Sequence, residues 1–226
     1  KKTLLEQYKK GVMQKIFSQE IRFKDDDGSE YPEWVEKKLG KVGETYNGLT
    51  GKTADDFGQG KPYIQYKQIF DKSKIDIDKF AFVHIDEREK QNIAKYGDVF
   101  FTTSSETPLE VGFASVLLDE IEEVYLNSFC FGYRANSLNI LKPEFSRYLF
   151  RSAMFRKEVV KLAQGSTRYN MSKVELMKIL IKLPSLKEQT KIANFLSSLD
   201  SKIDLATKQL NATKQFKKAL LQKMFV

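Results

Sequence analysis

Histidine and cysteine are almost missing from this sequence of 226 residues, which contains one of each, His84 and Cys130. A structural zinc site normally needs four ligands drawn mainly from these two residue types, so we expect no such site. A single cysteine cannot form a disulfide within the chain, which suits the reducing cytosol and favours a cytoplasmic protein. We interpret His84 as a partly buried strand residue, because no nucleophile-elbow glycines lie near it.

Several patterns that mark enzymes and membrane proteins are absent as well. The chain has neither a G-x-x-x-x-G-K-S/T phosphate loop nor a G-x-G-x-x-G motif. No run approaches the ~18 apolar residues that a membrane span requires. The first ten residues, KKTLLEQYKK, lack the apolar segment of a secretory signal. We therefore predict a chain that is not an enzyme, holds no metal and has no membrane partner.

Positive charge is concentrated in parts of the chain. The net charge is +8, yet residues 25–141 carry a net charge of −9. Residues 142–186 carry +7, and the two ends, 1–24 and 187–226, carry +5 each. Such segregation favours a polyanion or an acidic partner that meets one defined face of the folded protein.

The two ends of the chain resemble each other. YKKGVMQKIF at residues 8–17 aligns with FKKALLQKMF at 216–225, and two further upstream residues give twelve aligned positions, six of them identical. We interpret this match as a duplication and not as a chance similarity of two lysine-rich helices. A parent built as module, arm, module, arm would explain it. This chain would then hold the end of the first arm, one module and the second arm.

A long helix is predicted for the second arm. Residues 185–188 form an S-x-x-E capping box, and neither glycine nor proline occurs from Leu186 to Phe225. Apolar residues spaced alternately by four and three form a heptad seam typical of a coiled coil. This seam predicts an interface at Ile192, Leu196, Leu199, Ile203, Leu210, Leu220 and Met224.

A shorter helix is predicted at about residues 3–18. Apolar residues recur at helical spacing on one face: Leu5, Tyr8, Val12 and Ile16. A helix of this length can cover only about residues 186–202 of the second arm, which leaves the seam beyond Ile203 without a partner. We therefore predict a homodimer that forms through the arms.

The residues between the arms predict a mixed α+β module. β-rich stretches separated by glycine predict strands at 62–70, 98–104, 112–118 and 122–135. One helix is expected at about 143–162, with Pro143 in its first turn, followed by a strand in KILIKLP. We expect a twisted, mainly antiparallel sheet.

Four stretches resemble the specificity subunits of bacterial type I restriction–modification systems. LPSLKEQTKIANFLSSLDSKID, residues 183–204, is similar to the start of the distal conserved helix of that family. The others resemble its target-recognition domain: YPEWVEKKLGKV at 31–42, SSETPLEVGFA at 104–114 and QGSTRYNMS at 164–172. The family has two recognition domains and this chain has one, so it corresponds to a half or a fragment of the subunit.

This resemblance divides the chain into three parts and implies a function. Residues 1–24 would be the end of the central conserved helix, 25–184 a DNA target-recognition domain, and 185–226 the distal conserved helix. Each recognition domain of such a subunit reads one half of a split site in double-stranded DNA, and the paired arms set the spacing between the halves.

The resemblance also implies partners. The arms dock modification subunits, which bind S-adenosylmethionine and methylate adenine, and restriction subunits join for ATP-driven translocation and cleavage. The chain itself has no Asn-Pro dipeptide and so no N-P-P-Y/F methyltransferase motif. No cofactor is therefore expected within it.

Candidates for DNA contact combine hydrogen-bonding side chains with nearby cations. The strongest candidate follows a glycine within the +7 segment: Ser166, Thr167, Arg168, Tyr169 and Asn170. Further candidates are Tyr66, Lys67 and Gln68, the polar stretch Ser104, Ser105 and Glu106, and, for phosphate, Arg147, Arg151, Arg156 and Lys157.

Each candidate also has a purely structural alternative. The 166–170 stretch can be a capped loop whose side chains satisfy its own backbone, and residues 104–107 can be an ordinary turn. Tyr66 can pack at a strand edge, and the cations of 147–157 can form a solvated helix face. A different function is open too: a protein–protein scaffold that works through its heptads and its acidic 25–141 region, with no DNA readout.

Overall fold

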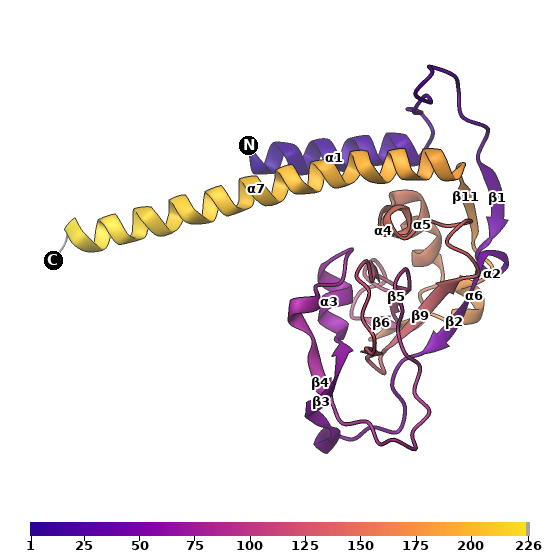
Figure 1. Ribbon diagram of the computed structural model, residues 1–226, viewed down its shortest axis with the longest axis vertical. Coiled ribbons are helices and arrows are strands. Elements are labelled where there is room, and N and C mark those ends of the chain that lie inside the picture. The colour runs from indigo at the N-terminus through magenta and orange to yellow at the C-terminus, as the bar shows by residue number, and fades with distance from the viewer. Residues whose placement is uncertain (225–226) are drawn as a thin grey trace.

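The computed structural model describes residues 1–224, with side chains to Gln222. The chain forms a mixed α+β module from which a helical arm projects (Figure 1). The side chain of Met224, which belongs to the predicted arm interface, lies outside the described part. No helix within residues 1–224 is apolar over a length that could cross a membrane.

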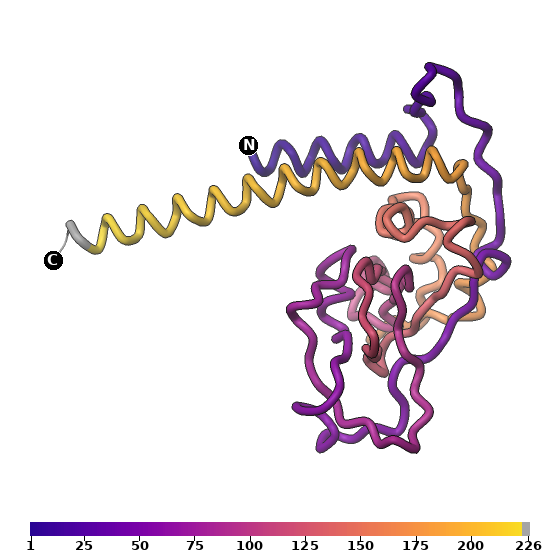
Figure 2. The backbone as a smooth tube through the Cα atoms, in the orientation of Figure 1, coloured from indigo at the N-terminus to yellow at the C-terminus, as the bar shows by residue number. Residues whose placement is uncertain are grey.

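The arm consists of two antiparallel helices of unequal length. Helix α1, Lys2–Phe17, lies along the first half of helix α7, Leu186–Met224, and its N-terminus lies beside the middle of α7 (Figures 1 and 2). Both helices were predicted. Tyr8 is 56% exposed, so its predicted place on the inner face is wrong. Lys9 takes that place, because its ammonium contacts the carboxylate of Asp200 on α7.

The start of α7 is fixed by half of the predicted capping box. The Ser185 hydroxyl accepts a hydrogen bond from the Glu188 backbone N–H at 3.3 Å. The Glu188 carboxylate does not return to Ser185; it is buried, and its Oε2 lies 3.6 Å from Nη2 of Arg22. Burial raises the pKa of this carboxyl above its ordinary value, while Trp34 and Arg22 oppose the rise.

A four-stranded antiparallel sheet forms the centre of the module, in the order β2 (Gly43–Asn47), β9 (Cys130–Ala135), β5 (Val99–Thr102) and β7 (Ala114–Val116). Successive side chains of β5 point to opposite faces of the sheet, so the strand packs into two different cores. Val99 and Phe101 pack into the main core, which also receives α1, α4, α5 and α7. Phe100 faces the other way, into a second cluster that contains Ile64. All four residues of β5 are therefore buried.

Smaller sheets surround this centre. Strands β4 (Ala81–Val83), β3 (Phe57–Ile64) and β8 (Tyr125–Leu126) form a three-stranded sheet in which the β3–β8 pair is parallel. Strand β1 (Val35–Lys38) pairs with β11 (Leu180–Leu183), and β6 (Ser104–Ser105) pairs with β10 (Tyr169–Asn170). The short helices are α2 (Leu39–Val42), α3 (Tyr66–Asp71), α6 (Lys173–Leu176), and the 3-10 turns η1 (Ala54–Asp56) and η2 (Ile77–Lys79). The α+β class and the mainly antiparallel sheet are confirmed.

Several predicted elements differ from the structure. The strand expected at 98–104 is divided into β5 and β6, and the one expected at 122–135 into β8 and β9, with the two parts in different sheets each time. The strand expected at 62–70 ends at Ile64, and the chain continues as α3. The helix expected at 143–162 is divided into α4 (Pro143–Leu149) and α5 (Ala153–Lys161). The division has a local cause, because the Ser152 hydroxyl accepts a hydrogen bond from the Phe155 N–H at 3.2 Å and caps a new helix.

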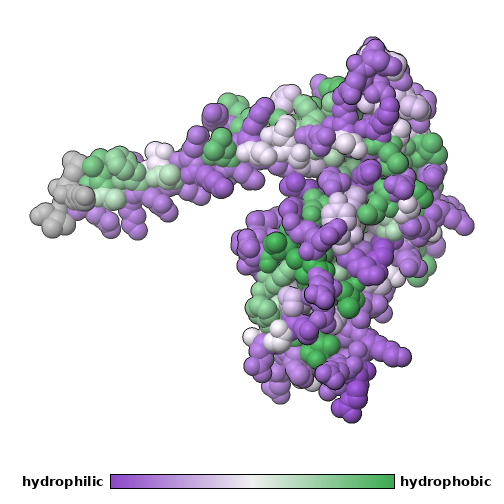
Figure 3. Space-filling model, viewed as in Figure 1, coloured by the Kyte–Doolittle hydropathy of each residue, from purple (hydrophilic) through white to green (hydrophobic). Residues whose placement is uncertain are grey.

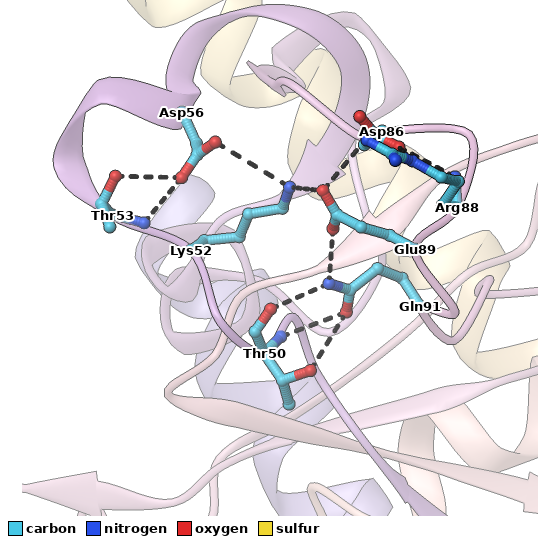
Figure 4. Close-up of polar contacts among 8 residues, drawn as sticks. All are labelled: Thr50, Lys52, Thr53, Asp56, Asp86, Arg88, Glu89 and Gln91. Atoms are coloured by element: carbon cyan, nitrogen blue, oxygen red, sulfur yellow. Dashed lines mark hydrogen bonds and ion pairs between the residues drawn. The ribbon is translucent and has the colours of Figure 1, made fainter.

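A polar clamp ties together two loops next to the three-stranded sheet (Figure 4). Nζ of Lys52 lies 2.5 Å from Oε1 of Glu89 and 3.9 Å from Oδ1 of Asp56, and the Lys52 side chain is only 5% exposed. Gln91 bonds to the backbone of Thr50 through both ends of its amide. Hydrogen bonds from Gln91 and Lys52 lower the pKa of Glu89 to about 2. The clamp holds in place a region with little regular structure.

Candidate nucleic-acid interface

Three stretches that were predicted separately for DNA contact meet in the structure. Strand β10 pairs with β6, so that Tyr169 lies opposite Ser105 and Asn170 opposite Ser104. The Tyr66 hydroxyl at the start of α3 donates a hydrogen bond to the Ser104 carbonyl at 2.7 Å. The sequence gives no sign of this proximity, because the stretches are separated by 38 and about 65 positions.

Residues 164–170 form a tight loop at this place. Gln164 and Asn170 exchange backbone hydrogen bonds of 2.9 and 2.8 Å and close the loop. Gly165 has a φ of +131°, and a Cβ atom there would lie 2.2 Å from the Arg168 carbonyl oxygen. Only glycine fits such a position. The closure makes Ser166, Thr167 and Arg168 the exposed tip of the loop.

The tip presents groups suited to a nucleic acid. Arg168 is exposed, and within residues 1–224 its guanidinium makes no hydrogen bond or ion pair. A guanidinium offers five N–H donors that match either a phosphate or the O6/N7 edge of guanine. The hydroxyls of Ser166 and Thr167 and the amide of Asn170 are exposed beside it. The alternative reading, in which the loop side chains only satisfy the loop backbone, accounts for Asn170 alone, whose Nδ2 lies 3.5 Å from the Arg168 carbonyl.

Sequence reasoning missed an aromatic residue next to this loop. Phe129 is 61% exposed, and its carbonyl accepts a hydrogen bond of 2.7 Å from the Thr103 hydroxyl. The backbone carbonyl of Thr103 in turn accepts a hydrogen bond of 2.9 Å from the N–H of Met171, the residue just after β10. The N–H of Phe129 donates to the Asn127 side chain at 2.8 Å, and this turn aims Phe129 outward before β9 begins. The available signal was Asn127, a residue that favours such turns.

Several predicted residues have other roles here. The side chains of Ser104 and Ser105 are buried, and the Ser105 hydroxyl donates to Glu110 at 3.2 Å, whereas Glu106 is exposed. Both ends of the Gln68 amide bond to backbone groups, the carbonyl of Lys79 and the N–H of Asp76. Lys67 is exposed and forms an ion pair of 3.1 Å with Asp71, one turn later on α3.

Arg151 and Arg156 are structural. The Arg151 guanidinium donates to the carbonyls of Ala114, Ile69, Phe70 and Lys72 at 2.6–3.0 Å. Arg156 donates to the carbonyls of Gly112 and Leu109, and both guanidinium groups lie 4.7 Å from the centre of the Phe113 ring. Burial lowers the pKa of each arginine to about 10, so both stay charged at neutral pH. Two of the three guanidinium nitrogens of each arginine donate to backbone carbonyls, and we no longer expect Arg151 to bind phosphate.

Arg147 connects the module to the arm. Its Nε donates to the Ser73 hydroxyl at 2.9 Å, and its Nη2 lies 3.1 Å from Oδ2 of Asp200 on α7. Its predicted phosphate contact is therefore replaced by an internal ion pair. Lys157, by contrast, is exposed and lines an apolar groove between α5 and the β1–β11 pair.

The predicted interface residues of α7 fall into two groups. Ile192, Leu196 and Leu199 are buried within the chain, against α1 and the module. Ile203 is half-buried, whereas Leu210 and Leu220 are 42% and 49% exposed. Leu205, Phe216 and Leu221 are exposed as well, so the free half of α7 carries a hydrophobic surface (Figure 3).

Comparison with known proteins agrees with this architecture. The family model described as the type I restriction modification DNA specificity domain matches residues 31–215. The chain belongs to this specificity-domain family. The resemblance noted in the sequence is thereby confirmed. The specificity-domain family is in general noncatalytic.

Two curated relatives of the specificity-domain family come from Methanocaldococcus jannaschii. The putative type I restriction enzyme MjaX specificity subunit is 30% identical over 218 residues, which cover 92% of this chain and 49% of the relative. The MjaVIII specificity subunit is 27% identical over 229 residues, covering 96% and 52%. The chain therefore spans about half the length of these relatives.

Solved structures of specificity subunits share the fold. The type I S subunit from M. genitalium superposes with a TM-score of 0.56 at 12% identity, over 86% of this chain and 45% of that one. The HsdS subunit from Thermoanaerobacter tengcongensis gives 0.57 at 18% identity, over 92% and 48%. The module with its long helix is thus the fold of one half of such a subunit.

Proposed function

We propose that this chain is a noncatalytic DNA reader that recognises one half of a bipartite site for a type I restriction–modification complex. One observation carries the proposal: in a specificity-domain chain, the closed 164–170 loop presents Arg168, which pairs with no group among the described residues 1–224, beside two other predicted contact stretches. Arg168 would read a base edge or a phosphate, with Ser166, Thr167 and Asn170 beside it. Phe129 would pack against the nucleic acid as an exposed apolar group.

The proposed partners follow from the family. Its members bind DNA and assemble with methyltransferase and restriction subunits. We infer that the same applies here, with S-adenosylmethionine and ATP bound by those subunits and not by this chain. The arm would provide the docking surface through the exposed Phe216 on its free half, which leaves the seam residues Leu210 and Leu220 to a second copy of the chain. A homodimer through the arms would present two identical readers to a palindromic split site.

A binding titration tests the reader function. The chain, alone and with its methyltransferase subunits, is titrated onto mixed DNA duplexes over a series of salt concentrations. We expect binding that weakens steeply with salt and a subset of duplexes that bind more tightly. Methylome sequencing of cells with and without the gene then identifies the site. Negligible binding at low salt, even with the methyltransferase subunits present, would disprove the reader function.

A second candidate function is a protein scaffold without DNA readout. The exposed apolar surface on α7 favours it, since such a surface on a soluble helix marks a protein contact. The same titration separates the two functions. A scaffold would assemble with its protein partners while showing no preference among duplexes.

A further inference from the structure

The free end of α7 repeats the pattern by which α1 contacts the rest of the protein. The residues of α1 that face α7 and the core are Lys9, Val12, Met13, Ile16 and Phe17. At the offset of 208 the sequence places Lys217, Leu220, Leu221, Met224 and Phe225. Lysine is kept at the first position, and each other position keeps a large apolar residue.

Helix α1 and the free end of α7 carry side chains of the same kinds but have different neighbours. Val12 and Met13 pack against the main core, whereas Leu220 and Leu221 expose 49% and 43% of their surface. Exposed leucines on one stripe of a helix lose the free energy that burial would provide. The end of α7 is therefore suited to the kind of site that α1 already occupies.

That site is built around Asp200. Its carboxylate accepts a hydrogen bond from the Tyr148 hydroxyl at 2.8 Å and pairs with Arg147 at 3.1 Å. The same carboxylate contacts the Lys9 ammonium, which lies 5.3 Å from the centre of the Tyr148 ring. The site thus selects a helix with one lysine followed by apolar residues three and seven positions later. Lys217, Leu220 and residue 224 have this spacing.

The seam of α7 is also symmetric in sequence. Its positions, alternating by four and three, are 192, 196, 199, 203, 206, 210, 213, 217, 220 and 224, which are symmetric about residue 208. Two antiparallel copies of α7 centred on residue 208 would place Leu196 beside Leu220 and Asp200 beside Lys217 of the second copy. Lys9 already shows this register, because it contacts Asp200 and is the counterpart of Lys217.

We propose that residues 214–224 of one copy dock in the α1 site of a second copy and displace its α1. The two α7 helices would then form one antiparallel coiled coil that also covers Leu210, which α1 leaves 42% exposed. Helix α1 belongs to the same chain as its site and so has a high effective concentration there. It acts as an internal competitor that restrains dimer formation. The inference rests on the homodimer proposed above and is independent of DNA reading.

Matched charge reversals in the full chain test the competition. Lys217→Glu removes the lysine of the incoming helix, and Lys9→Glu removes the lysine of the competitor. By sedimentation equilibrium we expect Lys217→Glu to raise the dimer Kd about tenfold and Lys9→Glu to lower it by a similar factor, as for a partly buried ion pair. Lys10→Glu and Lys218→Glu are controls, because they change the same charge at neighbouring exposed positions and should shift the Kd less than about twofold.

Cysteine cross-linking tests the register without relying on stability. Chains with Ala206→Cys are mixed with chains with Leu210→Cys under mild oxidation. The proposal expects a disulfide-linked dimer from this mixture, and the native Cys130 is too buried to compete. A linkage between Leu210→Cys and Leu220→Cys instead would show that the free halves pair beside an undisturbed α1. That result would overturn the proposal. So would an unchanged dimer Kd for the Lys9→Glu variant, or a chain that stays monomeric at every concentration. If the chain is a monomer and still discriminates among duplexes, the docking proposal fails while the reader function stands.

Discussion

Arginines of one basic segment have different roles because their neighbours differ. The carbonyls that hold Arg151 belong to residues 37 to 82 positions away. Arg168 lies on a loop closed by residues only a few positions away, and its guanidinium faces solvent. Local sequence therefore predicts the exposure of Arg168 correctly. It cannot predict the partners of Arg151, because they depend on the fold of the whole module.

Arg168→Ala should weaken binding to the recognised site. We expect a loss of ~1–3 kcal/mol with relaxed preference at one base pair if Arg168 reads a guanine. A uniform loss across duplexes, with a smaller salt slope, would assign Arg168 to a phosphate. Lys37→Ala is the control, since Lys37 lies on β1, which pairs with β11 and not with β10. Unchanged affinity and preference would remove Arg168 from the interface.

Phe129→Ala tests the residue that sequence reasoning missed. Since the ring is 61% exposed, its removal should leave the denaturation midpoint nearly unchanged. Affinity for DNA should fall by roughly 1–3 kcal/mol if the ring packs on bases. Fluorescence anisotropy with a labelled duplex measures this. Phe82→Ala, an exposed phenylalanine on β4, provides the matched control.

Arg151→Ala should destabilise the fold. Removing the guanidinium leaves four carbonyls without this donor, three of them part-buried, and an unpaired acceptor that stays buried costs roughly 1–3 kcal/mol. Arg151→Lys should rescue little, since an ammonium lacks the planar fork of donors. Urea denaturation measures the change, with the exposed Lys157→Ala as control. A wild-type midpoint for Arg151→Ala would return this residue to the candidates for phosphate contact.

At the scale of elements, the long helices and the strands that begin at hydrophobic runs were predictable from local patterns. The S-x-x-E at the start of α7 and the heptads after it depend on nearby residues only. The break at Ser152 was missed, although serine is a strong helix N-cap, because the apolar stripe continued through it. The β6–β10 and β1–β11 pairs were not predictable either. Such pairing depends on long-range register, which no short motif encodes.

Gly165→Ala tests whether the loop closure positions the contact residues. A Cβ at this φ, 2.2 Å from the Arg168 carbonyl oxygen, forces the loop open. We expect faster amide exchange at residues 164–170 and weaker sequence preference, with the rest of the module intact. Gly11→Ala is the control, because a Cβ there meets no atom within 4 Å, and in a helix it should be neutral or stabilise by up to ~1 kcal/mol. Unchanged exchange in the Gly165 variant would show that closure is not needed.

The clamp around Lys52 should respond to acid. The pKa of Glu89 is lowered from 4.5 to about 2 in the folded chain, so its ionised form stabilises the fold. This stabilisation is complete above pH 4.5 and is lost as the pH falls toward about 2. The amide-exchange protection factors of residues 50–56, which compare each measured rate with the intrinsic rate at the same pH, should therefore fall over that window. Glu89→Gln should lower these protection factors at neutral pH and flatten their pH dependence; a profile identical to wild type would contradict this role.

For the whole molecule, the internal arginines set an upper limit on the salt dependence of DNA binding. Residues 142–186 contain ten basic residues, of which Arg147, Arg151 and Arg156 donate within the protein through part-buried hydrogen bonds. If no more than the other seven basic residues contact phosphates, the slope of log K against log salt should be about −6 or shallower, at ~0.9 per phosphate. Anisotropy titrations in a potassium chloride series measure this slope. A value near −9 would mean that the internal arginines also reach the DNA or that other segments do.

The pairing of α1 with α7 also sets the order in which the chain can fold. Ile16 and Phe17 belong to the same core as Ile192 and Leu196, and Lys9 meets Asp200 across 191 positions. Contacts of such long sequence separation form late, because closing a long loop costs chain entropy before any contact repays it. Helix α1 is synthesised well before α7, and it must therefore remain without this partner until α7 has been made. The nascent chain is exposed to chaperones and proteases throughout that interval.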